Sequence, residues 1–281
     1  MTSSRVVSDA MRQMTGAIGE PETDRPATPP APHEHLDVID NVLRDTSTPD
    51  QTRRWLLKRA AGGAALAGAL GLMDPIGTAF AATKSGADTP QMVGTIAVTA
   101  ETFAVTYLGA VLEKDAGVMP ALVKDVIRAA DVEEFYHRKF LVEAGFKPLT
   151  HDFYLPKALF GPTVKHVAAV IEIAETLFVN AYLIGITVFS AAGSPKLARY
   201  AGEILGVEAE HRTLARFVQG KLPNNVAFES YRFHRLDEIV GQLEDAGVGF
   251  GKPTKKGGNK FRYHGLGNNG RGVNIKDHKP S

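Results

Sequence analysis

The chain has 281 residues, a formal net charge of +1 and no cysteine. The length allows one large domain or two small ones, and the balanced charge gives no reason to expect nucleic acid as a partner. The lack of cysteine excludes disulfides, thiolate nucleophiles, a lipoprotein anchor and cysteine-based zinc or iron–sulfur sites, so any metal ion must be held by oxygen and imidazole ligands.

Residues 1–51 predict a disordered leader. They are polar and rich in proline, above all at 26–32, and contain too little apolar material to offset the entropy of ordering. Residues 35–44 could form one short amphipathic helix, but nothing around them completes a core. Because 52 residues precede Arg53, either the leader is long or translation starts further downstream.

Residues 52–81 are typical of a secretory signal of the twin-arginine type. The pair Arg53-Arg54 stands before an uncharged run at 60–73, and Leu56 occupies the position where phenylalanine is commonest. The uncharged run has 73 − 60 + 1 = 14 residues, whereas a membrane span needs roughly 20. The competing interpretation is a basic stretch before a buried alanine-rich helix.

A cleavage site follows the uncharged run. Ala79-Phe80-Ala81 has the small-x-small pattern that signal peptidases accept. We therefore expect the mature chain to begin at or next to Ala82. The expected partner is the twin-arginine export machinery, and the expected location is the periplasm or cell envelope, or outside the cell.

Four long helical segments come next, each opened by proline at the first turn or by a small residue and proline. Apolar residues recur at helical spacing throughout, and no segment alternates with the period of a strand, so we expect no β-sheet. The expected helices cover residues 90–114, 120–143, 162–190 and 195–219.

The connections predict how these helices are arranged. The first and third connections are short, which is typical of antiparallel helical hairpins. The second runs over 145–161; its seventeen residues can reach over about 50 Å, and a helix of about 25 residues is about 38 Å long. The sequence therefore predicts an all-α, ferritin-like four-helix bundle over 82–222, with one long crossover between its second and third helices.

The pattern fades after the bundle. Within 223–250, residues 236–243 predict one short packing helix among loops. Residues 251–281 are rich in glycine, asparagine, lysine and arginine, so we expect a disordered basic tail. The tail is expected to be merely solvated, with binding of a polyanion as the alternative.

The two predicted hairpins repeat one pattern. A glutamate near the middle of one helix is followed, 33 residues later, by Glu-x-x-His near the middle of the next, since 134 − 101 = 33 and 208 − 175 = 33. The repeated residues are Glu101, Glu134, His137, Glu175, Glu208 and His211.

This pattern predicts a metal site. Residues three apart lie on one face of a helix, so each Glu-x-x-His can offer a carboxylate and an imidazole to one centre. Four carboxylates in one apolar core would repel one another, and two divalent cations would neutralise them. One glutamate from each of two helices and one Glu-x-x-His from each of the others is the ligand set of dimetal carboxylate bundles. The alternative is that each Glu-x-x-His is a solvated surface pair.

Neighbouring residues leave some assignments open. Glu133, Glu172 and Glu210 compete with Glu134, Glu175 and Glu208 as ligands. Tyr107 and Tyr182 lie six and seven residues after Glu101 and Glu175 and could donate hydrogen bonds to the ligands. At helical spacing, plain core aromatics are the other interpretation of both tyrosines.

The stretch 95–217 resembles the ferritin-like domain of the bacterial desiccation-related group. The resemblance rests on three motifs: Glu134-x-x-His137 with Gly145-x-x-Pro148 behind it, the run from Glu175 to Tyr182, and Glu208-Ala-x-His211. It implies a di-iron or di-manganese site in which Glu134 and Glu208 bridge the ions and Glu101 and Glu175 are terminal ligands.

The resemblance does not select one reaction, because function belongs to the site rather than to the fold. We expect an exported, oxidoreductase-type metalloprotein, ferroxidase- or catalase-like, that reacts with O2 or peroxide in the context of stress protection. A metal-poor envelope scaffold or stress protein, binding a partner through the bundle surface, is the alternative. Iron storage would require a cage-forming shell.

Overall fold

The computed structural model describes residues 88–115, 117 and 119–280. The predicted leader at 1–51 and the predicted signal at 52–81, with Arg53, Arg54, Ala79 and Ala81, lie outside the described residues.

Four long helices form the bundle, as the sequence predicts. Thr89 begins the first helix: its side chain accepts a hydrogen bond from the Met92 amide at 3.3 Å, and proline occupies the first turn. The third helix begins two residues later than predicted because Thr163 caps it through the His166 amide at 3.2 Å. The helices are α5 (Pro90–Glu113), α6 (Ala121–Glu143), α7 (Val164–Ala191) and α8 (Pro195–Val218).

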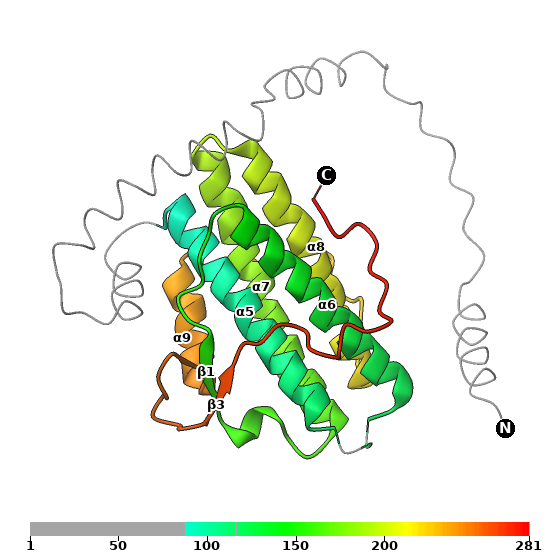
Figure 1. The fold of residues 1–281 in the computed structure, drawn as a ribbon. Helices are drawn as coiled ribbons and strands as arrows, with labels where there is room; N and C mark the ends of the chain where they lie inside the picture. The colour runs from blue at the N-terminus through cyan, green and yellow to red at the C-terminus, as the bar shows by residue number, and fades with distance from the viewer. Residues whose placement is uncertain (1–87, 116, 118, 281) are drawn as a thin grey trace, which may run out of the picture. The chain divides into compact units, whose positions relative to one another are not determined.

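The helices pack as two antiparallel hairpins, α5 with α6 and α7 with α8 (Figure 1). The hairpins meet through α5 against α7 and, more sparsely, α6 against α8. The connection from α6 to α7 runs along the bundle to the opposite end, where α7 begins (Figure 1). The predicted ferritin-like bundle with a long second connection is confirmed.

Two of these helices, α5 and α7, are long and apolar enough to cross a membrane by length and composition alone. Of the most apolar 18-residue stretch of α5, 83% is buried inside the structure, so packing in the bundle core explains its apolar composition. The corresponding stretch of α7 is 50% buried, because one side of that helix faces outward.

A small sheet contradicts the expectation that no sheet would form. Strand β1 (Asp152–Leu155), in the crossover, is the central strand of the order β2-β1-β3, and both pairings are antiparallel. Its neighbours, β2 (Gly249–Phe250) and β3 (Asn259–Arg262), come from beyond the bundle. Strands of two to four residues are too short to show a period of two, which is why the sequence did not predict them.

The sheet is anchored to the bundle by aromatic packing. Phe153 of β1 is fully buried, and its ring centroid lies 5.7 Å from that of Phe103 in α5 and 6.0 Å from that of Phe250 in β2. The crossover continues into a 3-10 turn, Lys157–Leu159, before α7. The long connection is therefore fixed against α5 along its length.

A fifth helix, α9 (Leu236–Ala246), lies where a short packing helix is predicted and contacts α7. Its apolar face, with Leu236, Ile239 and Leu243, is buried. Gly247 ends the helix in the left-handed conformation at φ 106°, which glycine adopts without steric cost.

The segment expected to be a disordered tail is instead held against α6. Arg128 donates from Nε to the Asn269 carbonyl at 3.1 Å, and the Asn269 side-chain amide donates to Asp131 Oδ2 at 3.2 Å. Further along α6, the Arg138 guanidinium lies over the Tyr263 ring, 4.1 Å from its centroid. The contacts are polar and side-chain specific, so a composition rich in glycine and charge gave no sign of them.

The contact between Asn269 and Asp131 leads to a testable expectation. Asp131 is fully buried, and burial raises its pKa to about 7 even though the Asn269 amide lowers it. Asn269→Ala should destabilise the protein by about 1–3 kcal/mol, because a buried carboxyl loses its amide partner. The loss should grow above pH 7, where Asp131 is ionised.

The measurement is the thermal unfolding midpoint, which should fall by about 2–4 °C per kcal/mol in a domain of this size. Asn268→Ala is the matched control, since Asn268 is exposed and only its carbonyl is used, by the Arg271 amide. Equal midpoints for the two variants would show that Asn269 does not support the fold.

Candidate metal centre

The centre lies where four glutamates meet in the bundle core. Glu101 of α5, Glu134 of α6 and Glu208 of α8 have 0% of their surface exposed, and Glu175 of α7 has 3%. All four lie near the middle of their helices, so each helix places one carboxylate at the same level of the core. Such burial is costly for a carboxylate unless it is neutralised, paired or coordinated.

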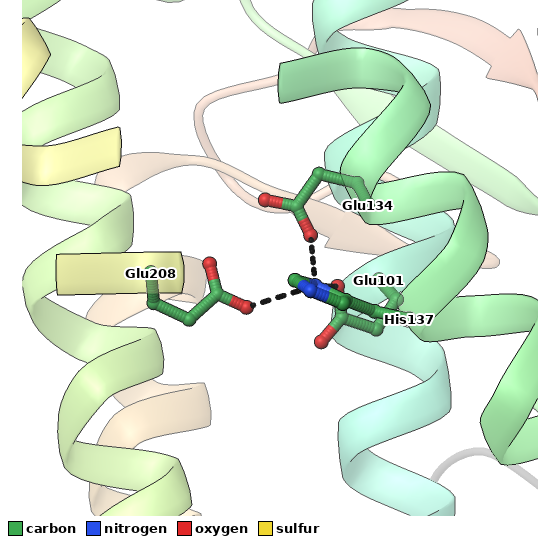
Figure 2. A group of neighbouring side chains, drawn as sticks. All are labelled: Glu101, Glu134, His137 and Glu208. Carbon is green, nitrogen blue, oxygen red and sulfur yellow. Dashed lines mark hydrogen bonds and ion pairs between the residues drawn. The ribbon is translucent and has the colours of Figure 1, made fainter. Parts of the chain in front are cut away.

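Two histidines complete the centre and divide it into two overlapping groups. Each group offers four ligand atoms within 4.8 Å of one another. Figure 2 shows the first group, in which three carboxylates turn toward the His137 ring. The groups are Glu101, Glu134, His137 and Glu208, and Glu134, Glu175, Glu208 and His211.

Glu134 and Glu208 belong to both groups, and each points one carboxylate oxygen toward each histidine. Glu134 Oε2 is 3.3 Å from His137 Nδ1, and its Oε1 is 3.1 Å from His211 Nδ1. Glu208 Oε1 is 3.5 Å from His137 Nδ1, and its Oε2 is 3.6 Å from His211 Nδ1. A carboxylate that divides its oxygens in this way is placed to bridge two cations.

Glu101 and Glu175 each belong to a single group. Glu101 Oε2 lies 3.7 Å from His137 Nδ1, and Glu175 Oε1 lies 3.9 Å from His211 Nδ1. The structure thus brings together all six residues that the repeated pattern selects.

The structure also separates the competing glutamates. Glu172 points away from the centre and pairs with Arg216 at 2.9 Å and with Gln219 at 2.7 Å, and Glu210 is exposed on α8. Glu133 has a different place: its Oε2 lies 2.7 Å from Nε2 of His211. A histidine that ligates through one nitrogen commonly uses the other on a carboxylate, which fixes its orientation. The sequence raised Glu133 as a ligand but did not predict this role.

The two tyrosines differ. Tyr182 donates a hydrogen bond to Glu101 Oε1, so it contacts the centre as one interpretation of the sequence had it. Tyr107 instead donates to the Leu159 carbonyl at 2.7 Å, fastening α5 to the crossover. The expectation that Tyr107 serves the ligands is wrong, because its hydroxyl points toward the end of the bundle.

A family model described as a ferritin-like domain matches residues 81–221, half of the chain. The chain belongs to the ferritin-like domain family. The match covers all four bundle helices and every residue of the two groups. Neither the curated proteins nor the solved structures contain a match.

Two glutamates of the ferritin-like core have raised pKa values, so their protonated form is favoured when no cation is bound. Burial, with the nearby charge of Glu134, raises the pKa of Glu101 to about 8. Burial, with the charges of Glu208 and Glu134, raises the pKa of Glu175 well above its ordinary value. Glu101 and Glu175 are the two glutamates that each belong to only one of the two groups.

The shared glutamates behave in the opposite way. Burial opposes their ionisation, but the neighbouring His137 and His211 side chains outweigh it and lower the pKa of both Glu134 and Glu208. Burial likewise opposes protonation of the two histidines, yet the surrounding carboxylates raise both pKa values well above 6.5. The metal-free centre therefore places carboxylates whose ionisation is favoured beside imidazoles whose protonation is favoured.

Hydrogen bonds within the centre leave some of its buried polar atoms without a partner. These atoms show whether the centre fits cations. Within the described part of the chain, several buried atoms of the centre have no hydrogen-bond partner: Glu101 Oε2, Glu134 Oε1, Glu175 Oε2, both oxygens of Glu208 and Nδ1 of His211. Unpaired buried acceptors in a native core call for an explanation such as a missing ion. All of these atoms belong to residues of the two groups, so the residues fit a pair of cations.

The contact between Glu133 and His211 predicts a selective effect. Glu133→Gln should weaken binding of the ion on the His211 side by roughly 10–100-fold, because the imidazole loses the carboxylate that orients it. Binding on the His137 side should change little, so isothermal titration with Mn(II) should resolve two unequal steps. Glu143→Gln, an exposed position on the same helix, is the control. An unchanged titration of Glu133→Gln would show that the contact has no part in holding the ion.

Proposed function

We propose that this protein is an exported non-haem dimetal carboxylate protein, loaded with two iron or two manganese ions, that reacts with O2 or peroxide. The activity would be ferroxidase- or catalase-like and would serve stress protection, in line with the resemblance to the desiccation-related group. The observation that carries the proposal is the division of the Glu134 and Glu208 oxygens between His137 and His211.

The donor set supports iron or manganese. Carboxylate and imidazole ligands without any thiolate suit these metals, whereas magnesium and calcium prefer all-oxygen sites and magnesium retains several waters. Glu134 and Glu208 would hold both ions, and Glu101 with His137 and Glu175 with His211 would complete one position each. When bound, the ions supply the electrons that pass to the oxidant.

The protein's own residues would position the metal ligands and exchange protons. Tyr182 fixes the Glu101 carboxyl by a hydrogen bond, and Glu133 fixes the His211 ring. The surrounding core excludes bulk water, since five of the six residues are buried. Glu101 and Glu175, whose pKa values are raised in the metal-free core, would release their protons when the ions bind.

The export signal that the sequence predicts at 52–81 agrees with the same proposal, because the twin-arginine route generally carries proteins already folded around their cofactor. Replacing Arg53 and Arg54 by lysine should leave the precursor in the cytoplasm, as the paired arginines are what the machinery reads. Fractionation with N-terminal sequencing is the measurement, and the mature protein should begin at or next to Ala82. Envelope protein that retains residues before Trp55 would contradict the cleavage.

The decisive experiment is the metal content of protein purified from its native compartment. About two iron or manganese ions per chain, followed by oxidation of added Fe(II) under O2 or breakdown of peroxide, would support the proposal. Intact protein that contains no metal and gains none from Fe(II) or Mn(II) would overturn it in favour of a metal-poor scaffold.

A further inference from the structure

An apolar cavity leads from the surface of the bundle to His211. It lies on the side where α6 and α8 meet, and α7 supplies much of its wall. Its lining includes half-buried as well as buried side chains, and we call this cavity the funnel. The half-buried lining includes Val123, Val126, Val164 and Val218, and the buried lining Leu108, Ala168, Ala215 and His211.

His211 is the only polar side chain among the twelve that line this cavity. Its two nitrogens are already directed elsewhere: Nε2 lies 2.7 Å from Glu133 Oε2, and Nδ1 faces the shared carboxylates, 3.1 Å from Glu134 Oε1. The cavity therefore offers a water molecule almost nothing to bond to, whereas an ordered buried water typically makes about three hydrogen bonds.

The size of the cavity limits what it can hold. Its volume of about 30 Å³ is room for a molecule of a few atoms. Alanines at 130, 168 and 215 keep it open, since larger side chains on these three helices would close it. Two further apolar cavities touch Tyr182, but neither is lined by any of the six residues of the metal centre.

We propose that this funnel is the entry path of dioxygen to the metal centre and delivers it at the His211 side. The inference rests on the proposed function and concerns dioxygen, one of its two oxidants. Dioxygen is small and apolar and loses no hydrogen bonds on entering such a lining, whereas peroxide would have to give up its hydration without compensation. Peroxide must therefore reach the centre by another way.

The test fills the funnel while leaving the ligands in place. Ala130→Leu extends a side chain from α6 into the cavity, and Ala129→Leu is the matched control, since residue 129 is half-buried on the same helix but does not line the cavity. Val126→Phe, at a half-buried position of the lining, is a second filling variant in case Ala130→Leu folds poorly. Circular dichroism and metal content should match the wild type in all three variants.

The first readout needs no metal. Crystals of the metal-free protein pressurised with xenon should show a xenon atom beside His211 in the wild type and in Ala129→Leu, and none in Ala130→Leu. The second readout uses Fe(II)-loaded protein: oxidation by O2 should slow by about tenfold in Ala130→Leu and Val126→Phe, corresponding to about 1.4 kcal/mol on the barrier. Oxidation by peroxide should be unchanged.

A wild-type cavity without xenon would overturn the inference, and so would equal rates with O2 in the filled and control variants. Both results would leave the dimetal function standing, because that function is read from metal content. Protein that binds xenon beside His211 but takes up no metal would overturn the proposed function and, with it, the delivery of dioxygen to a metal centre.

Discussion

Glu208→Gln is expected to abolish binding of both metal ions. Each Glu208 oxygen faces a different histidine, at 3.5 and 3.6 Å, so this one side chain contributes to both positions. An amide of the same shape has one oxygen and no charge and can serve neither position as well. The loss in affinity should exceed the roughly 10–100-fold that follows loss of an outer partner.

The comparison with Glu175→Gln makes this result specific to a bridge. Glu175 belongs to one group only, so its loss should reduce the metal content from two ions to one. Glu210→Gln, two residues from Glu208 and exposed, should bind as the wild type does. Metal analysis after equilibrium dialysis against Mn(II) gives the three contents directly. If Glu208→Gln and Glu175→Gln each lost a single ion, Glu208 would not be shared.

The second large effect is an opposite pH dependence of the metal-free and the loaded protein. Glu101 has an ordinary pKa of 4.5 and a pKa of about 8 in the folded protein. The stability from its protonated form is therefore complete below pH 4.5 and is lost as the pH rises through about 8. The contribution of Glu175 to stability also falls as the pH rises, because its pKa is raised. The contributions of His137 and His211 change in the same direction and are complete below pH 6.5.

Glu134 and Glu208 have the reverse sign, because their pKa values are lowered: their contribution is present above pH 4.5 and is lost in acid. Between pH 6 and 9 the metal-free protein should thus become less stable, on the order of 1 kcal/mol per pH unit for each proton lost. Bound cations require deprotonated ligands, so the stabilisation by Mn(II) should grow over the same range.

Thermal unfolding from pH 6 to 9, with and without Mn(II), is the measurement. Glu101→Gln is informative because its amide stays neutral at every pH, so the metal-free variant should show a shallower decline than the wild type. Parallel curves for the metal-free and Mn(II)-treated wild type would mean that the cluster does not exchange protons for cations.

The residues that could be predicted from sequence are those whose spacing is local. Glu134 and His137 share a helical face, and the 33-residue offset repeats in both hairpins, so the positions of all six residues followed from helix geometry. The helix ends followed from proline, threonine and glycine punctuation. These features depend on residues a few positions apart, which is the range over which sequence patterns carry structural information.

What could not be predicted depends on contacts between distant segments. Glu133 is adjacent to Glu134, and only the approach of α8 gives it His211 Nε2 as a partner. Tyr107 and Tyr182 likewise look alike in sequence but have partners on different elements. Asn269 has no local pattern at all, since it lies in a turn and its partner Asp131 lies far away in the sequence, in α6.

The small sheet also determines the order in which parts of the fold can form while the chain is being synthesised. Strand β1 lies in the middle of the sequence, but both of its partners come after the bundle, so it stays unpaired until the ribosome has made residues 249–262. The last metal-facing residue, His211, is made well before them. A chain stopped between 219 and 248 would carry every ligand and lack both strands that pair with β1. The growing chain can therefore gather its four carboxylates before the segment containing Asn269 closes against α6, and cations can enter during that interval.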